Sequence, residues 1–143
     1  MCIRDRIEVV AADERDQGRR AVLNLGHTVG HAIEVAAGYG TLRHGEAVAI
    51  GMLAALRLSG AEDLRAEVAE LLARADLPTA IPAGVDVDAI IEATGRDKKR
   101  TAEGVPFVLL EAPGEATHGK LVDADSLRAA VEELSAQNDR ATA

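Results

Sequence analysis

The chain has few of the residues that stabilise small secreted domains or cross membranes. Cys2 is its single cysteine, so an internal disulfide is impossible, which agrees with a reducing compartment. No apolar run approaches the roughly 18 residues of a membrane span, and no secretory signal opens the chain. We therefore expect a cytoplasmic protein that has no membrane partner.

Aromatic residues and net positive charge are also scarce. Tyr39 and Phe107 are the only aromatic residues among 143, and the formal net charge is −8. An acidic chain repels nucleic-acid phosphates, so we expect no nucleic-acid partner, and any bound phosphate must meet local positive groups. The core must be built from Leu, Val, Ile and Ala, whose spacing here favours helices. The length and the 48% hydrophobic content suit one domain.

Hydrophobic periodicity predicts a mainly α domain with one or two short strands. Gly38 and Gly40 mark the end of one helix, and residues 105–110, VPFVLL, are the strong strand candidate. Asp125 or Ser126 is expected to cap the last helix. The predicted helices cover residues 3–12, 19–37, 44–60, 61–75, 87–94 and 125–136.

The chain divides into one domain and two short ends. Residues 1–6 begin abruptly, without a capping signal, and we interpret them as a leader outside the domain. Residues 7–136 form the predicted helical domain, and residues 137–143, QNDRATA, are expected to be a disordered tail.

The segment LNLGHTVGHAIE, residues 23–34, carries the most informative motif. His27 and His31 are four residues apart, so on a helix they project from one face. At helical spacing they continue a polar stripe that consists of Arg20, Asn24, His27 and His31. A face exposed to water usually holds Lys, Glu and Gln, whereas this one lies beside Gly26 and Gly30, which leave space for a ligand. The alternative is that the glycines permit close helix packing and that the histidines are satisfied core groups.

Two imidazoles on one face suggest a metal site. An HxxxH motif alone supplies at most two ligands and lacks the glutamate of HExxH. His44 opens the next predicted helix after a glycine-flanked reversal and is the candidate for a further ligand, with Glu46 as an acceptor that orients an imidazole. In the alternative interpretation, Glu46 only complements the helix dipole.

A basic cluster, RDKKR, follows the predicted helix 87–94. Its Lys98 and Lys99 fit an anion clamp, since ammonium groups bind phosphate or carboxylate as point charges. A solvated loop is the alternative. His118, which we expect in a turn before GKLVDADS, is given no chemical role.

Three segments, in this order, resemble the C-terminal half of the 3-dehydroquinate synthase family: EVVAADERDQGRRAVLNLGHTVGHAIE, GYGTLRHGEAVAIGM and RDKK…GVPFVLL. The resemblance runs over residues 7–121. In that family an NAD-binding α/β domain precedes a mostly helical metal-binding domain, and the active site lies between them. The resemblance covers only the second domain, which implies the multi-helical C-terminal domain of the dehydroquinate synthase-like fold.

The resemblance implies particular roles for residues of the motifs. The first histidine of GHTxGH and the histidine of HGE, His27 and His44, would bind Zn²⁺ or Co²⁺. His31 would face the substrate phosphate instead of the metal. The remaining groups that would bind the phosphate and carboxylate are Arg20, Asn24 and a lysine of DKK, with Lys98 favoured and Lys99 next.

The chain also departs from the family pattern. Asp16 stands where relatives have glutamate, and Arg6 stands where they have a substrate-binding lysine. The family's third metal ligand, a glutamate, and most of the NAD site belong to regions that the resemblance does not cover. We therefore expect no catalysis from this chain alone.

The activity implied by the resemblance is the conversion of 3-deoxy-D-arabino-heptulosonate 7-phosphate to 3-dehydroquinate and phosphate, a lyase step of the shikimate pathway that leads to aromatic amino acids. It uses NAD and a metal, and the full-length enzyme is expected to be a homodimer. Two alternatives stay open. One is a sugar-phosphate cyclase of the 2-deoxy-scyllo-inosose or valiolone synthase type, and the other is a non-catalytic helical module that binds a metal or a partner.

Overall fold

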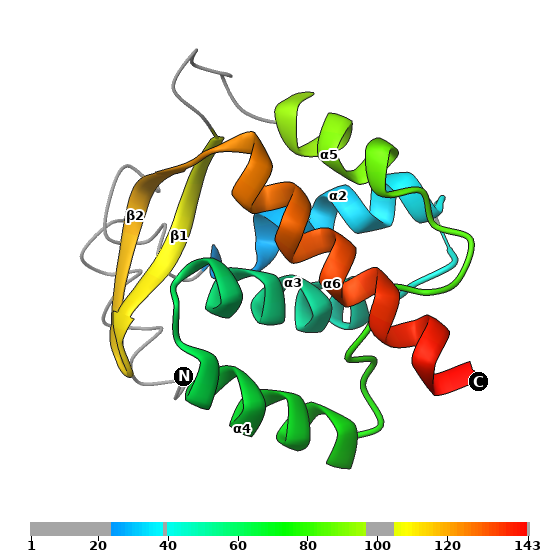
Figure 1. Cartoon of the computed structure of the whole chain (residues 1–143), viewed down its shortest axis with the longest axis horizontal. Coiled ribbons are helices and arrows are strands. Elements are labelled where there is room, and N and C mark those ends of the chain that lie inside the picture. The colour runs from blue at the N-terminus through cyan, green and yellow to red at the C-terminus, as the bar shows by residue number, and fades with distance from the viewer. Residues whose placement is uncertain (1–23, 39, 97–104, 143) are drawn as a thin grey trace.

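The computed structural model of the chain describes residues 24–38, 40–96 and 105–142. These residues form helices packed around a central helix, with a two-stranded sheet at one side (Figure 1). The prediction of a mainly α fold with short strands is confirmed. The helices are α2 (His27–Ala37), α3 (His44–Leu58), α4 (Glu62–Arg74), α5 (Val87–Arg96) and α6 (Ala124–Thr142), and the strands are β1 (Val105–Ala112) and β2 (Glu115–Val122).

Helix α3 lies at the centre of the fold. Ile50, Leu53 and Leu56 are almost fully buried, and four alanines of the same helix are buried as well. The small alanine side chains let neighbouring elements approach on several sides, and α3 contacts α2, α4, α6 and β1. A helix that is apolar around most of its circumference must be surrounded in this way.

Helix α2 is shorter than the sequence predicted. Gly26 has φ +82°, a left-handed conformation that a right-handed helix does not continue through. Residues 24–26 therefore form a turn, and α2 begins at His27 instead of Arg19. The prediction that the helix runs through residues 24–26 is therefore wrong. Residues 19–23 lie outside the described residues. The predicted end is confirmed, because α2 stops at Ala37 and Gly38 is its C-cap.

The predictions for α3, α4 and α5 are confirmed to within a few residues. The last helix, α6, begins and ends differently: its cap is Asp123, whose Oδ1 accepts the Ser126 N–H at 2.8 Å, instead of Asp125 or Ser126. This hydrogen bond lowers the pKa of Asp123. The helix continues to Thr142, past the predicted end near Ala136. The predicted helix 3–12 lies outside the described residues, and the boundaries of leader, domain and tail stay predictions.

Strands β1 and β2 form an antiparallel hairpin. The pairing runs from Val105 opposite Val122 to Ala112 opposite Glu115. This confirms the predicted strand, but His118 lies in β2, so its assignment to a turn was wrong. Phe107 of β1 is 3% exposed and packs into the core, which places the hairpin against the helices.

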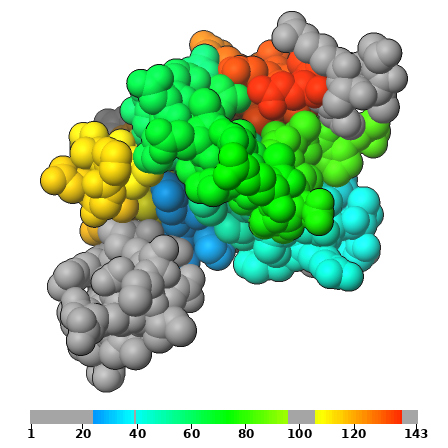
Figure 2. All heavy atoms as spheres, turned by 90° about the horizontal axis from the view of Figure 1, so that it is seen from below, coloured from blue at the N-terminus to red at the C-terminus, as the bar shows by residue number. Residues whose placement is uncertain are grey.

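Charged side chains join α3, α4 and α6. Arg57 Nε of α3 donates to Glu133 Oε2 of α6 at 2.9 Å, and an Arg65 guanidinium nitrogen of α4 donates to Glu133 Oε1 at 2.9 Å. We call Arg57, Arg65 and Glu133 the charged junction. Figure 2 shows α4, in green, spread across the face of the molecule that is seen from below.

Within the described residues, no helix has the length and hydropathy to cross a bilayer.

Candidate metal and substrate site

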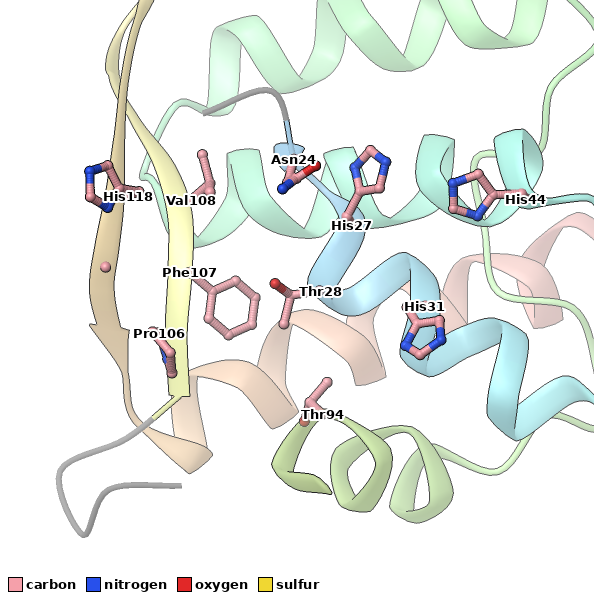
Figure 3. Close-up of a pocket in the computed structure, with 11 residues that line it drawn as sticks. Asn24, His27, Thr28, His31, His44, Thr94, Pro106, Phe107, Val108 and His118 are labelled. Carbon is pink, nitrogen blue, oxygen red and sulfur yellow. The ribbon is translucent and has the colours of Figure 1, made fainter. Parts of the chain in front are cut away.

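A cavity of about 480 Å³ lies where the start of α2, the start of α3, the end of α5 and the hairpin meet (Figure 3). Its volume is in the range of small-molecule pockets. All four histidines of the chain contribute to its lining, although they come from three different elements. These are His27 and His31 of α2, His44 of α3 and His118 of β2.

Three glycines let the backbones of α2 and α3 touch beside this cavity. A Cβ added to Gly51 would lie 2.1 Å from the Gly26 carbonyl oxygen, and one added to Gly30 would lie 3.0 Å from the Ala47 carbonyl oxygen. We call Gly26, Gly30 and Gly51 the glycine crossing. Gly26 and Gly30 thus make room for α3 and not for a ligand, which confirms the close-packing alternative for these two residues.

Two imidazoles meet beside the glycine crossing. His27 is the first residue of α2 and follows Gly26, and His44 is the first residue of α3. Because Gly26 lies against Met52 and Gly30 lies against Ala47, the two helices run antiparallel, and the two side chains meet from the starts of oppositely directed helices. Their ring centroids are 5.4 Å apart, with an angle of 60° between the ring planes. Bonds of about 2 Å from two imidazole nitrogens to one tetrahedral ion require a similar separation, roughly 5 Å.

The His27 ring has an unsatisfied polar atom. Its Nδ1 is buried, and in the described part of the chain no group is hydrogen-bonded to it. A buried polar atom without a partner is costly, so such atoms in native proteins usually mark a bound ion, a ligand or an ordered water. The residues present therefore fit a metal ion or a polar ligand at this position.

The acceptor for His44 is not the residue that the sequence suggested. Glu34 Oε2 lies 2.9 Å from His44 Nδ1, whereas Glu46 Oε2 accepts the Arg43 N–H at 2.7 Å. Glu46 thus stabilises the start of α3, which confirms the alternative interpretation of that residue. Glu34 was missed, although its spacing from His27, seven residues, places both on one face of α2.

Two further residues of the predicted stripe line the same cavity. Asn24 reaches it from the turn before α2, and His31 reaches it from one helical turn beyond His27. Asn24, His27 and His31 thus line one cavity, although they do not belong to one continuous helix. Arg20, Lys98 and Lys99 lie outside the described residues, so their roles stay predictions. Across residues 24–38, 40–96 and 105–142, no three His, Cys, Asp or Glu residues are arranged to hold a metal.

His118 is the pocket residue that sequence reasoning left without a role. It is exposed and comes from β2, on the hairpin side of the cavity (Figure 3). The strand pattern around it is weak, because the neighbouring Gly119 interrupts the alternation of side chains. Recognising β2 as the partner of VPFVLL would have placed it at the site.

Comparison with known proteins identifies close relatives of this chain. A family model described as 3-dehydroquinate synthase C-terminal matches residues 1–100. The 3-dehydroquinate synthase of Methylococcus capsulatus is 50% identical over 136 residues, which is 92% of this chain and 38% of that protein. The enzyme of the same name from a Synechococcus strain is 43% identical over 137 residues, 92% of this chain and 37% of that protein. The chain thus spans less than two fifths of these relatives.

Solved structures show the same fold. The structure of 2-deoxy-scyllo-inosose synthase complexed with carbaglucose-6-phosphate, NAD⁺ and Co²⁺ superposes with a TM-score of 0.80 at 26% identity, over 92% of this chain and 40% of that one. A second structure of 2-deoxy-scyllo-inosose synthase, 24% identical with a TM-score of 0.74, supports the fold alone. The family match covers most of the sequence, and the chain therefore belongs to the 3-dehydroquinate synthase family, matching its C-terminal domain.

Proposed function

We propose that the chain is the metal- and substrate-binding part of a 3-dehydroquinate synthase, which converts 3-deoxy-D-arabino-heptulosonate 7-phosphate to 3-dehydroquinate and phosphate. The observation that carries the proposal is the imidazole pair, His27 and His44, in a cavity that Asn24 and His31 also line. Identities of 43–50% to enzymes of that name support the choice of reaction.

His27 and His44 would hold the divalent ion, Zn²⁺ or Co²⁺. The 5.4 Å between their ring centroids and the unpartnered His27 Nδ1 fit this role, and the solved relative was obtained with Co²⁺. When bound, the ion polarises substrate oxygens, and NAD accepts and returns a hydride. A glutamate from a region of the family's proteins well upstream of the GHT motif, which the resemblance does not cover, would complete the ion's ligands.

The polar residues beside the imidazole pair would orient the substrate. Asn24 would donate its amide N–H to the carboxylate of the substrate, and His31 would donate a ring N–H to the phosphate. Arg20 and a lysine of DKK, Lys98 or Lys99, would add the positive charge that an acidic chain otherwise lacks. Fixing the carboxylate and the phosphate of the substrate would hold its reacting carbons in one position, which would lower the entropic part of the barrier.

A sugar-phosphate cyclase of the 2-deoxy-scyllo-inosose synthase type is the second candidate. The TM-score of 0.80 to that enzyme supports it, but the 26% identity is well below the 50% identity to a 3-dehydroquinate synthase. A non-catalytic module remains the third. A homodimer of the full-length enzyme and a cytoplasmic location stay predictions.

The metal assignment is tested by calorimetric titration of Zn²⁺ into the chain and two histidine variants. We expect His27→Ala to lower the affinity by about tenfold or more, because a ligand is lost, and His31→Ala to change it by less than about threefold. Circular dichroism of each variant checks the fold. Equal Zn²⁺ affinity of His27→Ala and the parent would overturn the assignment.

The substrate assignment is tested by binding. We expect the Zn²⁺-loaded chain to bind 3-deoxy-D-arabino-heptulosonate 7-phosphate more tightly than carbaglucose-6-phosphate, and His31→Ala to weaken that binding. A reversed preference between the two ligands would favour the cyclase alternative.

A further inference from the structure

Glu34 and His44 form a contact between two helices at the edge of the cavity. Glu34 Oε2 of α2 and Nδ1 of His44, the first residue of α3, are 2.9 Å apart. The Glu34 side chain is only 17% exposed, whereas the His44 side chain is 61% exposed. A carboxylate in the helix interface is thus directed at one nitrogen of a ring that is otherwise largely in solvent.

Stability of the fold gives a weak reason for this contact. Ion pairs or hydrogen bonds that have one largely exposed partner contribute little to folding, because water competes for the exposed group. Helices α2 and α3 are already held together by the glycine crossing, where backbone meets backbone. The contact is better explained by its effect on the imidazole.

A carboxylate fixes both the proton and the plane of the ring that it contacts. An ionised carboxylate only accepts hydrogen bonds, so Nδ1 of His44 must carry the hydrogen and the lone pair of the neutral ring is on Nε2. The opposite tautomer would direct the Nδ1 lone pair at the carboxylate. Histidines that bind metals usually donate their second ring N–H to a carboxylate or a carbonyl in this way.

This inference rests on the proposed function, and it deepens it. We propose that Glu34 is a positioning residue of the metal site: it holds His44 as the Nδ1–H tautomer, so that Nε2 presents its lone pair on the side of the ring away from Glu34, ready for the ion. Glu46, on the same turn of helix as His44, does not take this role, because its carboxylate accepts the Arg43 N–H.

The tautomer of His44 is measured without metal by two-bond ¹H–¹⁵N NMR correlations at about pH 8, above the usual range of histidine titration in proteins. We expect the parent to show the Nδ1–H form at His44. Glu34→Ala is expected to give the tautomer mixture of an exposed imidazole. Glu46→Ala removes a carboxylate from the first turn of α3, close to His44, and is the matched control, which is expected to keep the parent tautomer.

Co²⁺ titrations of the same variants give a second readout. We expect Glu34→Ala to weaken Co²⁺ binding by about 10- to 100-fold, the usual effect of losing such an acceptor, and Glu46→Ala to bind within about threefold of the parent. Glu34→Gln keeps a neutral acceptor and a similar shape, so it should recover part of the affinity and most of the tautomer preference. It also serves if Glu34→Ala does not fold.

The outcomes separate this inference from the proposed function. If His44→Ala weakens Co²⁺ binding but Glu34→Ala keeps the parent tautomer and affinity, or Glu34→Gln binds Co²⁺ as tightly as the parent, the positioning role is overturned and the metal site stands. If His44→Ala binds Co²⁺ as tightly as the parent, the proposed metal site fails, and the role of Glu34 fails with it.

Discussion

The two sides of helix α3 are held by different physical means. On the side of the cavity, the glycine crossing brings the backbones of α2 and α3 into direct contact. On the other side, the charged junction joins α3, α4 and α6 through hydrogen-bonded ion pairs, of which Arg57 and Glu133 are each 41% exposed. The first contact cannot adjust, whereas the second consists of long side chains that can move.

This difference matches what each side has to do. The proposed metal site would require two imidazoles at a fixed separation, and a rigid backbone contact beside them limits the movement of α2 against α3. The charged junction only has to keep α4 and α6 on the central helix, which tolerates small displacements. We therefore expect damage to the glycine crossing to alter both stability and the site, and damage to the charged junction to alter stability alone.

The largest effect is expected at Gly51. A Cβ there would lie 2.1 Å from the Gly26 carbonyl oxygen and 2.7 Å from the Gly30 amide nitrogen, both backbone atoms that cannot rotate away. We expect Gly51→Ala to force α2 from α3, to lower the free energy of unfolding by about 3 kcal/mol or more, and to weaken Zn²⁺ binding. Urea denaturation and calorimetry measure the two effects.

Gly45→Ala is the matched control for that substitution. It lies in the same helix, beside His44, and nothing is within 4 Å of its added Cβ. We expect a change between zero and a stabilisation of about 1 kcal/mol, because alanine is the better helix former. If Gly51→Ala were no more destabilising than this control, the crossing would not be the rigid contact described.

A smaller, pH-dependent effect is expected at the charged junction. Hydrogen bonds from Arg65 and Arg57 lower the pKa of Glu133 below its ordinary value of 4.5. Because the carboxyl pKa is lower in the folded protein, the charged junction gives its full stabilisation above the ordinary value of 4.5. This contribution is lost as the pH falls through the folded-state pKa. At about pH 7 we expect Glu133→Gln to cost about 1–2 kcal/mol, after allowing for solvent screening.

The check is the unfolding free energy of Glu133→Gln and the parent in urea at about pH 7 and about pH 3, where the difference should shrink as Glu133 becomes protonated. Zn²⁺ affinity should stay at the parent value. A difference that persists at the acidic pH, or a loss of Zn²⁺ affinity, would contradict the separation of the two sides.

Much of the fold follows from the sequence because its signals are local. Four-residue spacing of apolar side chains predicts α3 and α4, and Gly38 predicts the end of α2. The start of α2 could not be predicted in the same way. Gly26 adopts φ +82° where Gly51 and Met52 lie against it, and that contact joins residues far apart in the chain.

The site was predicted only in part, because some of its residues meet through contacts between elements far apart in the chain. Spacing and family motifs pointed to His27, His31 and His44, and the structure brings these residues to one cavity. Glu34 and His118 were missed, since their relevance depends on how α3 and β1 pack beside them. Glu46 was overrated because proximity in sequence to His44 does not show which way a carboxylate points.

The most direct test of the account is a double-mutant cycle on Co²⁺ affinity, with His27→Ala, His44→Ala and the double variant. If both imidazoles bind one ion, each single variant should lose most of the affinity, and the double variant should bind little more weakly than either one. Losses that simply multiply, or a single variant that binds Co²⁺ as the parent does, would contradict a shared metal site at the meeting of α2 and α3.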